Sequence, residues 1–448
     1  MTTPLMVMAD SSGQLFEHPY LCMVGALGKV PVTPETREIS PLPEGSRFFT
    51  IPGSLPVGGN PDADEIVTID EFDWGEGANT PQAACTFPAP GWMRTLIPVA
   101  DRTEGAETLP LWAYTALGFD PEYERFVCAA VQVDDCPRWS PEEYNDQNLP
   151  TRLAKMKKLF PKNRMIAHLD RCAADFHCFA AKNFFARRWE MGLPIAPLCN
   201  ADCRGCISLQ TDGLFASSHE RIDFVPTPEE LAEIGTFHLG GAEKAVASFG
   251  QGCEGEPLLQ GAVIERACRL IRERTCEGTL HLNTNGSHPE WVSRLAAAGL
   301  DSIRISTNSV LPERHRAYYR PETYGFAEIE DSVKAATNAA LYTQVNYLVF
   351  PGVTDREAEV AALLEFCRRT GVHVLQMKNL CIDPDLYLQT LDDTDKYGEA
   401  LGMARLLTIL GNELPDVAIR YFNHPKDEWH LDPGSTRNSV PEPMGGPK

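Results

Sequence analysis

From residue 191 onwards, short apolar runs alternate with longer stretches in which apolar residues lie three and four positions apart. The short runs are typical of buried strands, and the longer stretches are typical of amphipathic helices. Strands that alternate with helices predict an α/β fold with a parallel sheet. The expected strands are Leu193–Leu198, Ala245–Phe249, Thr279–Asn283, Ser302–Ser306, Gln344–Phe350 and Val372–Met377.

Residues typical of helix ends support this order. The segment 227–230 reads Thr-Pro-Glu-Glu, which resembles a capping box with proline at the first helical position. Pro257 and Pro289 are expected to open two further helices. Gly299 and Gly371 follow two expected helix ends, where glycine commonly forms the cap.

The N-terminal part of the chain has a different pattern. Short apolar runs there are separated by many prolines and glycines, which predicts a mixed, β-leaning accessory domain. The predicted regions are 1–139 for this accessory domain, 140–190 for a basic helical connector, 191–390 for the α/β domain and 391–448 for a C-terminal region.

The C-terminal region begins with the apolar periodicity of a helix, from Leu391 to about Leu410. A short apolar run then predicts a strand at Val417–Tyr421. Polar residues and prolines dominate the rest, so we expect a mobile tail.

The chain carries 62 acidic and 40 basic residues, a formal charge of -22. This charge repels a phosphate backbone and argues against bulk nucleic acid as a partner. No run approaches the ~20 apolar residues that span a bilayer. The first twenty residues lack the basic start and long apolar stretch of an export signal. We therefore expect a cytoplasmic protein without a membrane partner.

The charge is distributed unevenly. Residues 1–150 hold 23 acidic and 7 basic groups, whereas residues 151–190 hold 3 acidic and 10 basic groups. Such a basic run can bind an anionic substrate or a partner, or it can pair with an acidic surface of the same chain. We favour pairing with residues 1–150 for the closely spaced side chains, which are Lys155, Lys157, Lys158, Lys162 and Arg164.

Three cysteines, Cys199, Cys203 and Cys206, follow the first expected strand with C-x3-C-x2-C spacing. Fourteen cysteines without an export signal favour metal ligands or reactive thiols over disulfides. A [4Fe-4S] cluster normally takes four cysteines, so a loop with three leaves one iron open to another ligand. A structural zinc site is the alternative, but no histidine or fourth cysteine nearby in the sequence completes its usual paired spacing.

In this loop and in the turns that follow it, the chain resembles the radical S-adenosylmethionine (SAM) enzymes, over roughly residues 190 to 385. The resemblance implies a partial (β/α)6 barrel of the TIM type, with functional loops at the carboxyl ends of the strands. It also implies a [4Fe-4S] cluster and SAM as cofactors. In that family the reduced cluster cleaves SAM to methionine and a 5'-deoxyadenosyl radical, which abstracts hydrogen from the substrate.

The turns after the second and third strands carry part of this resemblance. Residues 252–257 read Gly-Cys-Glu-Gly-Glu-Pro and resemble the family's GGEP segment. The resemblance implies close backbone approach at Gly255 and a contact between Glu256 and the methionine ammonium. Residues 283–286 resemble the family's TNG turn, which makes Asn285 a candidate cofactor contact.

The turns after the later strands extend it. Ser306 and Asn308 offer a hydroxyl and an amide suited to the ribose hydroxyls and the methionine carboxylate. Residues 350–355 are similar to the segment that packs against adenine. One position departs from the family, because Gly205 stands where an aromatic residue usually meets the adenine. We expect Ile207 or the segment 350–355 to replace that contact.

Four upstream cysteines are a second candidate metal set, for an auxiliary iron-sulfur cluster or a zinc ion. Their spacing matches no strong template, and free cysteine is a frequent core residue, so we favour ordinary core thiols. His168 and His177 lie near two of them in the sequence and keep the metal hypothesis open. The four are Cys128, Cys136, Cys172 and Cys178.

Four residues at expected strand ends are candidates for contact with the substrate. Cys253 and Cys381 are each expected to be an inert buried side chain, a hydrogen-atom donor or a metal ligand. Asp383 and Asp385 either hydrogen-bond a substrate or are solvated. No catalytic residue is identified beyond the cofactor ligands.

The leading hypothesis is a radical SAM enzyme whose accessory domain shapes the substrate site. The alternatives are a non-catalytic iron-sulfur protein, used in electron transfer or structure, and a radical SAM methyltransferase, although no cobalamin-binding domain is recognisable. The expected substrate is a small metabolite, a cofactor precursor or a protein side chain, because no cysteine-rich C-terminal extension typical of peptide-modifying members follows Cys381. The expected electron donor is a flavodoxin or a ferredoxin.

Overall fold

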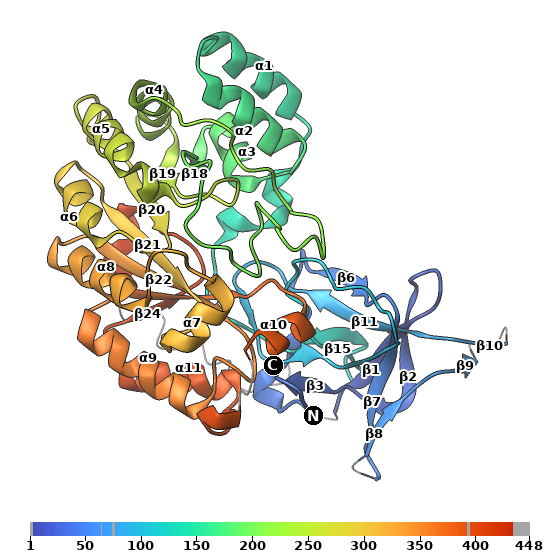
Figure 1. Ribbon diagram of the computed structural model, residues 1–448. Coiled ribbons are helices and arrows are strands. Elements are labelled where there is room, and N and C mark those ends of the chain that lie inside the picture. The colour runs from blue at the N-terminus through green and yellow to red at the C-terminus, as the bar shows by residue number, and fades with distance from the viewer. Residues whose placement is uncertain (1–2, 64, 74–76, 392–394, 433–448) are drawn as a thin grey trace, which may run out of the picture.

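The computed structural model describes residues 3–432 except 64, 74–76 and 392–394 (Figure 1). Its C-terminal half is built on one parallel sheet in which the strands follow each other in chain order. The sheet is curled, as in a partial barrel, and helices cover its outer face (Figure 1). Its strands are β18 (Arg188–Gly192), β19 (Glu243–Phe249), β20 (Thr279–Thr284), β21 (Ser302–Thr307), β22 (Tyr342–Val349), β23 (Val374–Asn379) and β24 (Ala418–Arg420).

The helices of this half alternate with its strands, which confirms the predicted α/β order and the partial barrel. The capping box forms as expected, with Thr227 accepting a hydrogen bond from the backbone of Glu230. Gly371 ends its helix in the left-handed conformation, with φ of 68°. The helices are α4 (Pro228–Leu239), α5 (Gly261–Arg272), α6 (Pro289–Ala297), α7 (Pro312–Tyr319), α8 (Phe326–Asn338), α9 (Glu357–Thr370), α10 (Pro384–Thr390) and α11 (Met403–Glu413).

The first predicted strand, Leu193–Leu198, was wrong, because β18 ends at Gly192. The apolar run contains Pro194 and Pro197, which cannot donate to a sheet. The backbone N–H groups of Ile195 and Ala196 donate instead to the Glu254 carboxylate, at 2.8 and 3.0 Å. The run is therefore an extended segment held by a side chain.

The C-terminal region also differs from its prediction. The long helix expected from Leu391 is replaced by a short 3-10 helix and by α11, which begins only at Met403. Gly398 and Gly402 have φ of 85° and 84°, a left-handed conformation that interrupts the expected helix before α11 begins. The strand expected at Val417–Tyr421 is confirmed as β24, whereas the tail expected to be mobile lies outside the described residues.

The N-terminal half is rich in antiparallel strands, as expected. Its largest sheet has ten strands, and smaller sheets pair β12 with β17, β9 with β10, and β3 with β4 and β13. The strands are β1 (Leu5–Ala9), β2 (Leu15–Cys22), β3 (Gly25–Leu27), β4 (Val30–Val32), β5 (Ser40–Pro41), β6 (Arg47–Thr50), β7 (Ser54–Asn60), β8 (Glu65–Thr68), β9 (Phe72–Asp73), β10 (Ala78–Asn79), β11 (Gln82–Phe87), β12 (Trp92–Arg94), β13 (Ile97–Pro98), β14 (Ala100–Arg102), β15 (Leu117–Asp120), β16 (Arg125–Cys128) and β17 (Ala130–Gln132).

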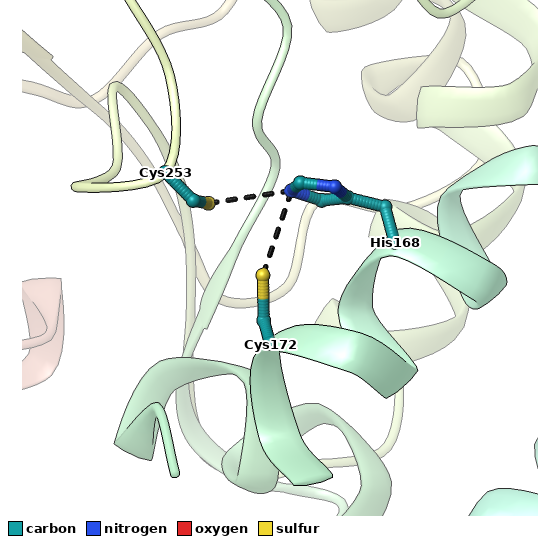
Figure 2. A group of neighbouring side chains, drawn as sticks. All are labelled: His168, Cys172 and Cys253. Atoms are coloured by element: carbon teal, nitrogen blue, oxygen red, sulfur yellow. Dashed lines mark hydrogen bonds between the residues drawn. The ribbon is translucent and has the colours of Figure 1, made fainter. Parts of the chain in front are cut away.

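The connector forms three helices, α1 (Leu149–Leu159), α2 (Arg164–Ala174) and α3 (Phe179–Ala186), which pack on the barrel. Met165, Leu169 and Phe184 belong to the same hydrophobic core as the parallel strands. Figure 2 shows one face of α2 turned toward the loop after β19. The connector is thus part of the barrel's packing.

The closely spaced basic residues of the connector were predicted to pair with residues 1–150. The two of them for which the structure shows an ion pair have other partners. Lys157 pairs with Asp170 of the connector itself, and Arg164 pairs with Glu230 of the barrel. Two other basic residues of the connector, Lys182 and Arg188, do pair with residues 1–150, through Asp146 and Glu143. The connector packs on the barrel helix α4, so the nearest acidic groups come from there.

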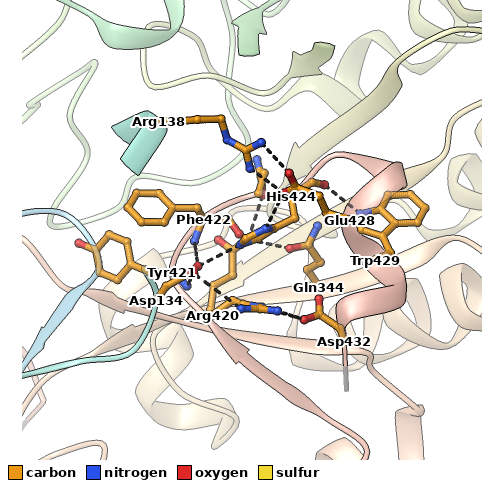
Figure 3. A network of polar contacts seen from close by, with 12 residues as sticks. Asp134, Arg138, Gln344, Arg420, Tyr421, Phe422, His424, Glu428, Trp429 and Asp432 are labelled. Carbon is orange, nitrogen blue, oxygen red and sulfur yellow. Dashed lines mark hydrogen bonds and ion pairs between the residues drawn. The ribbon is translucent and has the colours of Figure 1, made fainter. Parts of the chain in front are cut away.

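The segment after β24 is fixed to residues that precede the connector (Figure 3). Asp134 is buried and accepts hydrogen bonds from the backbone N–H groups of Tyr421 and Phe422, at 2.9 and 3.0 Å. Arg138 forms a bidentate pair with Glu428, at 2.9 and 2.7 Å. These contacts hold the last strand of the sheet in place.

The accessory domain meets the barrel at the carboxyl ends of its later strands. The buried guanidinium of Arg94 donates to the carbonyl oxygen of Leu380 at 2.7 Å, and the Arg94 backbone N–H donates to Asn379 at 2.9 Å. Arg102 pairs with Asp383 and Asp385, both at 3.0 Å. The accessory domain therefore borders the end of the barrel where functional loops are expected.

Short 3-10 helices complete the described elements, and none of the described helices is long and apolar enough to cross a membrane. The 3-10 helices are η1 (Thr36–Glu38), η2 (Pro137–Trp139), η3 (Pro141–Tyr144), η4 (Pro257–Gln260), η5 (Asp395–Tyr397) and η6 (Lys426–Leu431).

Candidate functional site

The cysteine loop, residues 199–206, lies beyond the carboxyl end of β18 and carries three free, partly buried thiols. Burial raises the pKa of Cys199 to about 11, and burial and the two neighbouring thiols raise the pKa of Cys203 well above its ordinary value. In the part of the chain that the structure describes, the three sulfurs do not form a set within 4.8 Å of one another. In a [4Fe-4S] cubane each thiolate binds a different iron, so the three sulfurs need not lie that close together.

Gly255 lies against the backbone of the cysteine loop. A Cβ atom at this position would lie 2.0 Å from the carbonyl oxygen of Leu198 and 2.9 Å from the nitrogen of Cys199. The backbone N–H of Gly255 donates to Ala196 at 2.6 Å, and that of Glu256 donates to Leu198 at 2.9 Å. Only glycine permits this approach, because any side chain would displace the loop.

Glu254 holds the extended segment that leads into the cysteine loop. Its carboxylate accepts three backbone hydrogen bonds, from Ile195, Ala196 and Gln251. Burial raises its pKa to about 7 in spite of these donors. Glu254 was not among the predicted site residues, although it lies inside the Gly-Cys-Glu-Gly-Glu-Pro segment.

Glu256 and Asn285 connect the loops after β19 and β20. The Glu256 carboxylate is buried and accepts hydrogen bonds from Leu258, Thr284 and the backbone of Asn285. The Asn285 side chain donates to Asn200 of the cysteine loop at 2.9 Å. Both residues thus lie beside the cysteine loop and fix its position, whereas their contacts with SAM stay a prediction.

Tyr318 explains why position 205 is glycine. A Cβ atom on Gly205 would lie 2.5 Å from the Tyr318 hydroxyl. Tyr318 lies on α7 and is buried, and its backbone carbonyl accepts a hydrogen bond from Arg204 at 3.0 Å. An aromatic ring therefore does border the cysteine loop, but it comes from α7, which no local sequence pattern could indicate.

Ser306 and Asn308 lie at the carboxyl end of β21 and just beyond it. Ser306 accepts a hydrogen bond from the side chain of Asn346 at 3.0 Å. The amide nitrogen of Asn308 donates to the Tyr387 hydroxyl at 3.0 Å, whereas its side-chain oxygen is buried and has no partner among the described residues. That oxygen is a free acceptor for a polar ligand.

The segment 350–355, expected to pack against adenine, packs on the accessory domain. Pro351 accepts a hydrogen bond from the backbone of Gly28 at 3.0 Å. A Cβ atom on Gly352 would lie 1.9 Å from the Gly28 nitrogen, and the Arg94 guanidinium lies 4.8 Å from the centre of the Phe350 ring. Much of this segment is therefore occupied by protein contacts.

Two cations lie on the inner face of the sheet. Lys378 is the penultimate residue of β23, and burial together with nearby Arg304 lowers its pKa to about 7. Its ammonium lies 3.9 Å from the centre of the Tyr421 ring. Burial also lowers the pKa of Arg304, whose Nε is buried without a hydrogen-bond partner in the described part of the chain. Lys378 was not among the residues predicted from the sequence.

Two of the candidate strand-end residues take different roles. Cys381 is partly buried near the cysteine loop, since its carbonyl oxygen lies 3.5 Å from the Cβ position of Gly205. Asp383 was expected to face substrate or solvent, but it is buried, caps α10 and accepts a hydrogen bond from the backbone of Leu109 at 2.7 Å. Asp383 therefore holds the accessory domain in place.

The four upstream cysteines do not converge within the described residues. Cys128 is buried in β16 of the accessory domain, and Cys136 precedes η2 beside Arg138. Cys172 lies instead with His168 and Cys253 in a buried group (Figure 2). His168, Cys172 and Cys253 were each named from the sequence, but their contact was not predicted, because α2 and the loop after β19 meet only in the folded chain.

Comparisons with known proteins fit this arrangement. Residues 193–364 match the family model described as the radical SAM superfamily. The match covers the barrel part of this chain, which is therefore similar to the radical SAM superfamily, whose members are enzymes that bind a [4Fe-4S] cluster and SAM.

Its relatives carry different names. The chain is 27% identical to the FeMo cofactor biosynthesis protein NifB of Klebsiella pneumoniae over 233 residues, which is 48% of this chain and 47% of that protein. It is 34% identical to a GTP 3',8-cyclase of Heliobacterium modesticaldum over 125 residues, 27% of this chain and 36% of that protein. A solved structure named native anSMEcpe with bound AdoMet covers 51% of this chain and 64% of its own, with 18% identity and a TM-score of 0.38. The chain spans about half the length of the curated relatives it matches, or less.

Proposed function

We propose that this chain is a radical SAM enzyme in which Cys199, Cys203 and Cys206 hold the [4Fe-4S] cluster. The observation that carries the proposal is the cysteine loop itself, with three free thiols on eight residues beside the carboxyl end of a parallel sheet. Arg221 donates to the Cys206 sulfur at 3.6 Å, and such hydrogen bonds to sulfur tune the reduction potential of a cluster.

When bound, the cluster and SAM supply a 5'-deoxyadenosyl radical and methionine by reductive cleavage of the sulfonium. The chain's own task is to bind, to orient and to exclude water. We assign SAM contacts to Gly255, Glu256, Asn285, Ser306 and Asn308. The unpartnered oxygen of Asn308 supports this assignment, because a buried acceptor without a donor is costly unless a ligand supplies one.

In this proposal Glu256 both contacts SAM and holds the neighbouring turns in place. Three of its hydrogen bonds come from the chain, so it holds the turns after β19 and β20 together. A carboxylate has about four lone-pair positions, so one remains for the ammonium of SAM. Burial raises the pKa of Glu256, and a cationic ligand beside it would favour the ionised form.

The substrate that best fits the inner face is an anion. Burial lowers the pKa of Lys378 and of Arg304, while nearby Glu190 raises both, and a bound anion would further favour their charged forms. Ser306 and Asn346 add polar contacts on the same face of the sheet. The relatives do not decide the substrate, because one is named for a metal cofactor and another for a nucleotide. A phosphorylated or carboxylated metabolite fits these charges.

We assign the supply of electrons to the cluster to an external flavodoxin or ferredoxin. Methyl transfer and a purely structural cluster are the competing functions, and the products of SAM separate them. The test is anaerobic reconstitution with iron and sulfide, reduction with dithionite and quantification of SAM products by mass spectrometry. The proposal predicts 5'-deoxyadenosine and methionine. S-adenosylhomocysteine would indicate methyl transfer, and intact SAM beside a reduced cluster would indicate a non-catalytic role.

A further inference from the structure

Three metal-ligating side chains meet outside the cysteine loop (Figure 2). The Nε2 atom of His168 lies 3.4 Å from the sulfur of Cys253 and 3.5 Å from the sulfur of Cys172. All three donor atoms lie within 4.8 Å of one another, and all three residues are buried. Nothing in the proposed SAM chemistry uses this group.

The distances match the edges of one coordination tetrahedron. Ligands at about 2.05 Å (nitrogen) and about 2.3 Å (sulfur) from a tetrahedral zinc ion lie about 3.6 Å apart. The two measured nitrogen to sulfur distances, 3.4 and 3.5 Å, are close to this value. The thiolates of an iron-sulfur cubane bind separate irons and are spread further apart. We propose that His168, Cys172 and Cys253 bind a single zinc ion.

The fold presents these ligands without rearrangement. His168 and Cys172 are four residues apart on α2, so their side chains share one face of the helix. Cys253 is held by its carbonyl oxygen, which accepts the backbone N–H of Ile222 at 2.8 Å.

His219 is a candidate fourth ligand, although its ring nitrogens lie outside the set of donor atoms within 4.8 Å of one another. Its Nδ1 atom is buried and has no hydrogen-bond partner in the described part of the chain. Its ring stacks on Phe176 with the ring centres 5.5 Å apart. A set of two cysteines and two histidines is a common structural zinc site.

Such an ion would link the connector to the SAM-binding part of the barrel. Cys253 directly precedes Glu254 and Gly255, which fix the backbone of the cysteine loop. His168 and Cys172 come from α2, which otherwise reaches this loop through apolar packing. The metal would therefore hold the loop after β19 in the position that the cysteine loop needs, as structural zinc contributes folding free energy elsewhere.

The test separates this ion from the proposed cluster. The full chain and its Cys199→Ala/Cys203→Ala/Cys206→Ala variant are purified anaerobically, and zinc and iron are counted by inductively coupled plasma mass spectrometry. The inference predicts roughly one zinc per chain in both proteins and little iron in the variant. Cys172→Ser and Cys253→Ser should each retain less than about a tenth of the zinc, whereas Cys268→Ser, a buried cysteine of α5, should retain all of it.

X-ray absorption at the zinc edge of the cysteine-loop variant needs no substitution in the new site. It should show two sulfurs at about 2.3 Å and two nitrogens at about 2.0–2.1 Å. Absence of zinc would overturn the inference and leave a hydrogen-bonded core group or a disulfide. About four irons with sulfide in the cysteine-loop variant would overturn it in favour of an auxiliary cluster. Neither result depends on whether the protein cleaves SAM.

Discussion

Replacing Gly255 with alanine should disrupt the cysteine loop directly. The new Cβ would lie 2.0 Å from the carbonyl oxygen of Leu198 and 2.9 Å from the nitrogen of Cys199. Both atoms belong to the backbone, so no side-chain rotation relieves the overlap. The loop must move away from the segment 254–256, and Cys199 moves with it.

The loss in the free energy of unfolding can be estimated from the contacts that this movement breaks. Two backbone hydrogen bonds cross the contact, from Gly255 to Ala196 at 2.6 Å and from Glu256 to Leu198 at 2.9 Å. Their loss at about 1 kcal/mol each and overpacking at about 1–3 kcal/mol sum to about 3–5 kcal/mol. A change of that size is a large part of the stability of a typical domain.

The assay compares this variant with Gly411→Ala. Gly411 lies in α11, and a Cβ atom there meets nothing within 4 Å, so alanine should stabilise the helix by up to about 1 kcal/mol. Urea unfolding gives the change in free energy, and iron content after anaerobic reconstitution gives the loss of the cluster. If Gly255→Ala kept wild-type stability and bound a full complement of iron, the contact described here would be wrong.

The remaining predictions concern charge. Glu256→Ala should weaken SAM binding by about 1 to 3 kcal/mol, and calorimetry that finds unaltered affinity would remove Glu256 from the site. The rate at which an amine reagent labels Lys378 should reach half its maximum near pH 7, because burial lowers its pKa to about 7, and peptide mass spectrometry that places the midpoint of its rate with the surface lysines would contradict this. Burial lowers the pKa of His281 to about 3, so this imidazole is neutral in the folded chain. Between pH 6.5 and 3 only the unfolded chain binds its proton, so the free energy of unfolding decreases as the pH is lowered. In His281→Gln, urea titrations should lack this loss of about 1.4 kcal/mol per pH unit, and an unchanged slope would show that the imidazole titrates normally.

The strands and helices of the barrel were largely predictable, because each depends on a local pattern of apolar residues and caps. The capping box at Thr227 and the left-handed Gly371 formed as expected. The segment 193–198 was mistaken for a strand because its apolar residues resemble one, while its prolines and the Glu254 carboxylate decide otherwise. A side-chain acceptor 58 residues away from Ala196 leaves no local signal.

The candidate site divides in the same way. Contiguous motifs, such as the cysteine loop and the segment 252–257, could be read from the sequence. Contacts between distant segments could not, and they include Tyr318 beside Gly205, Asp383 beneath the accessory domain, and Cys172 beside Cys253. Cys172 was grouped with the wrong partners because spacing along the chain says little about distance between separate elements.

The most direct test of the central claim is the fate of SAM in Cys203→Ser and in Cys276→Ser. Cys203 is one of the three proposed cluster ligands, and Cys276 is an exposed cysteine outside the loop. After anaerobic reconstitution and reduction, wild type and Cys276→Ser should form 5'-deoxyadenosine and methionine in equal amounts, and Cys203→Ser should form neither. Formation of 5'-deoxyadenosine at the wild-type rate by Cys203→Ser would contradict the assignment of the cluster to this loop.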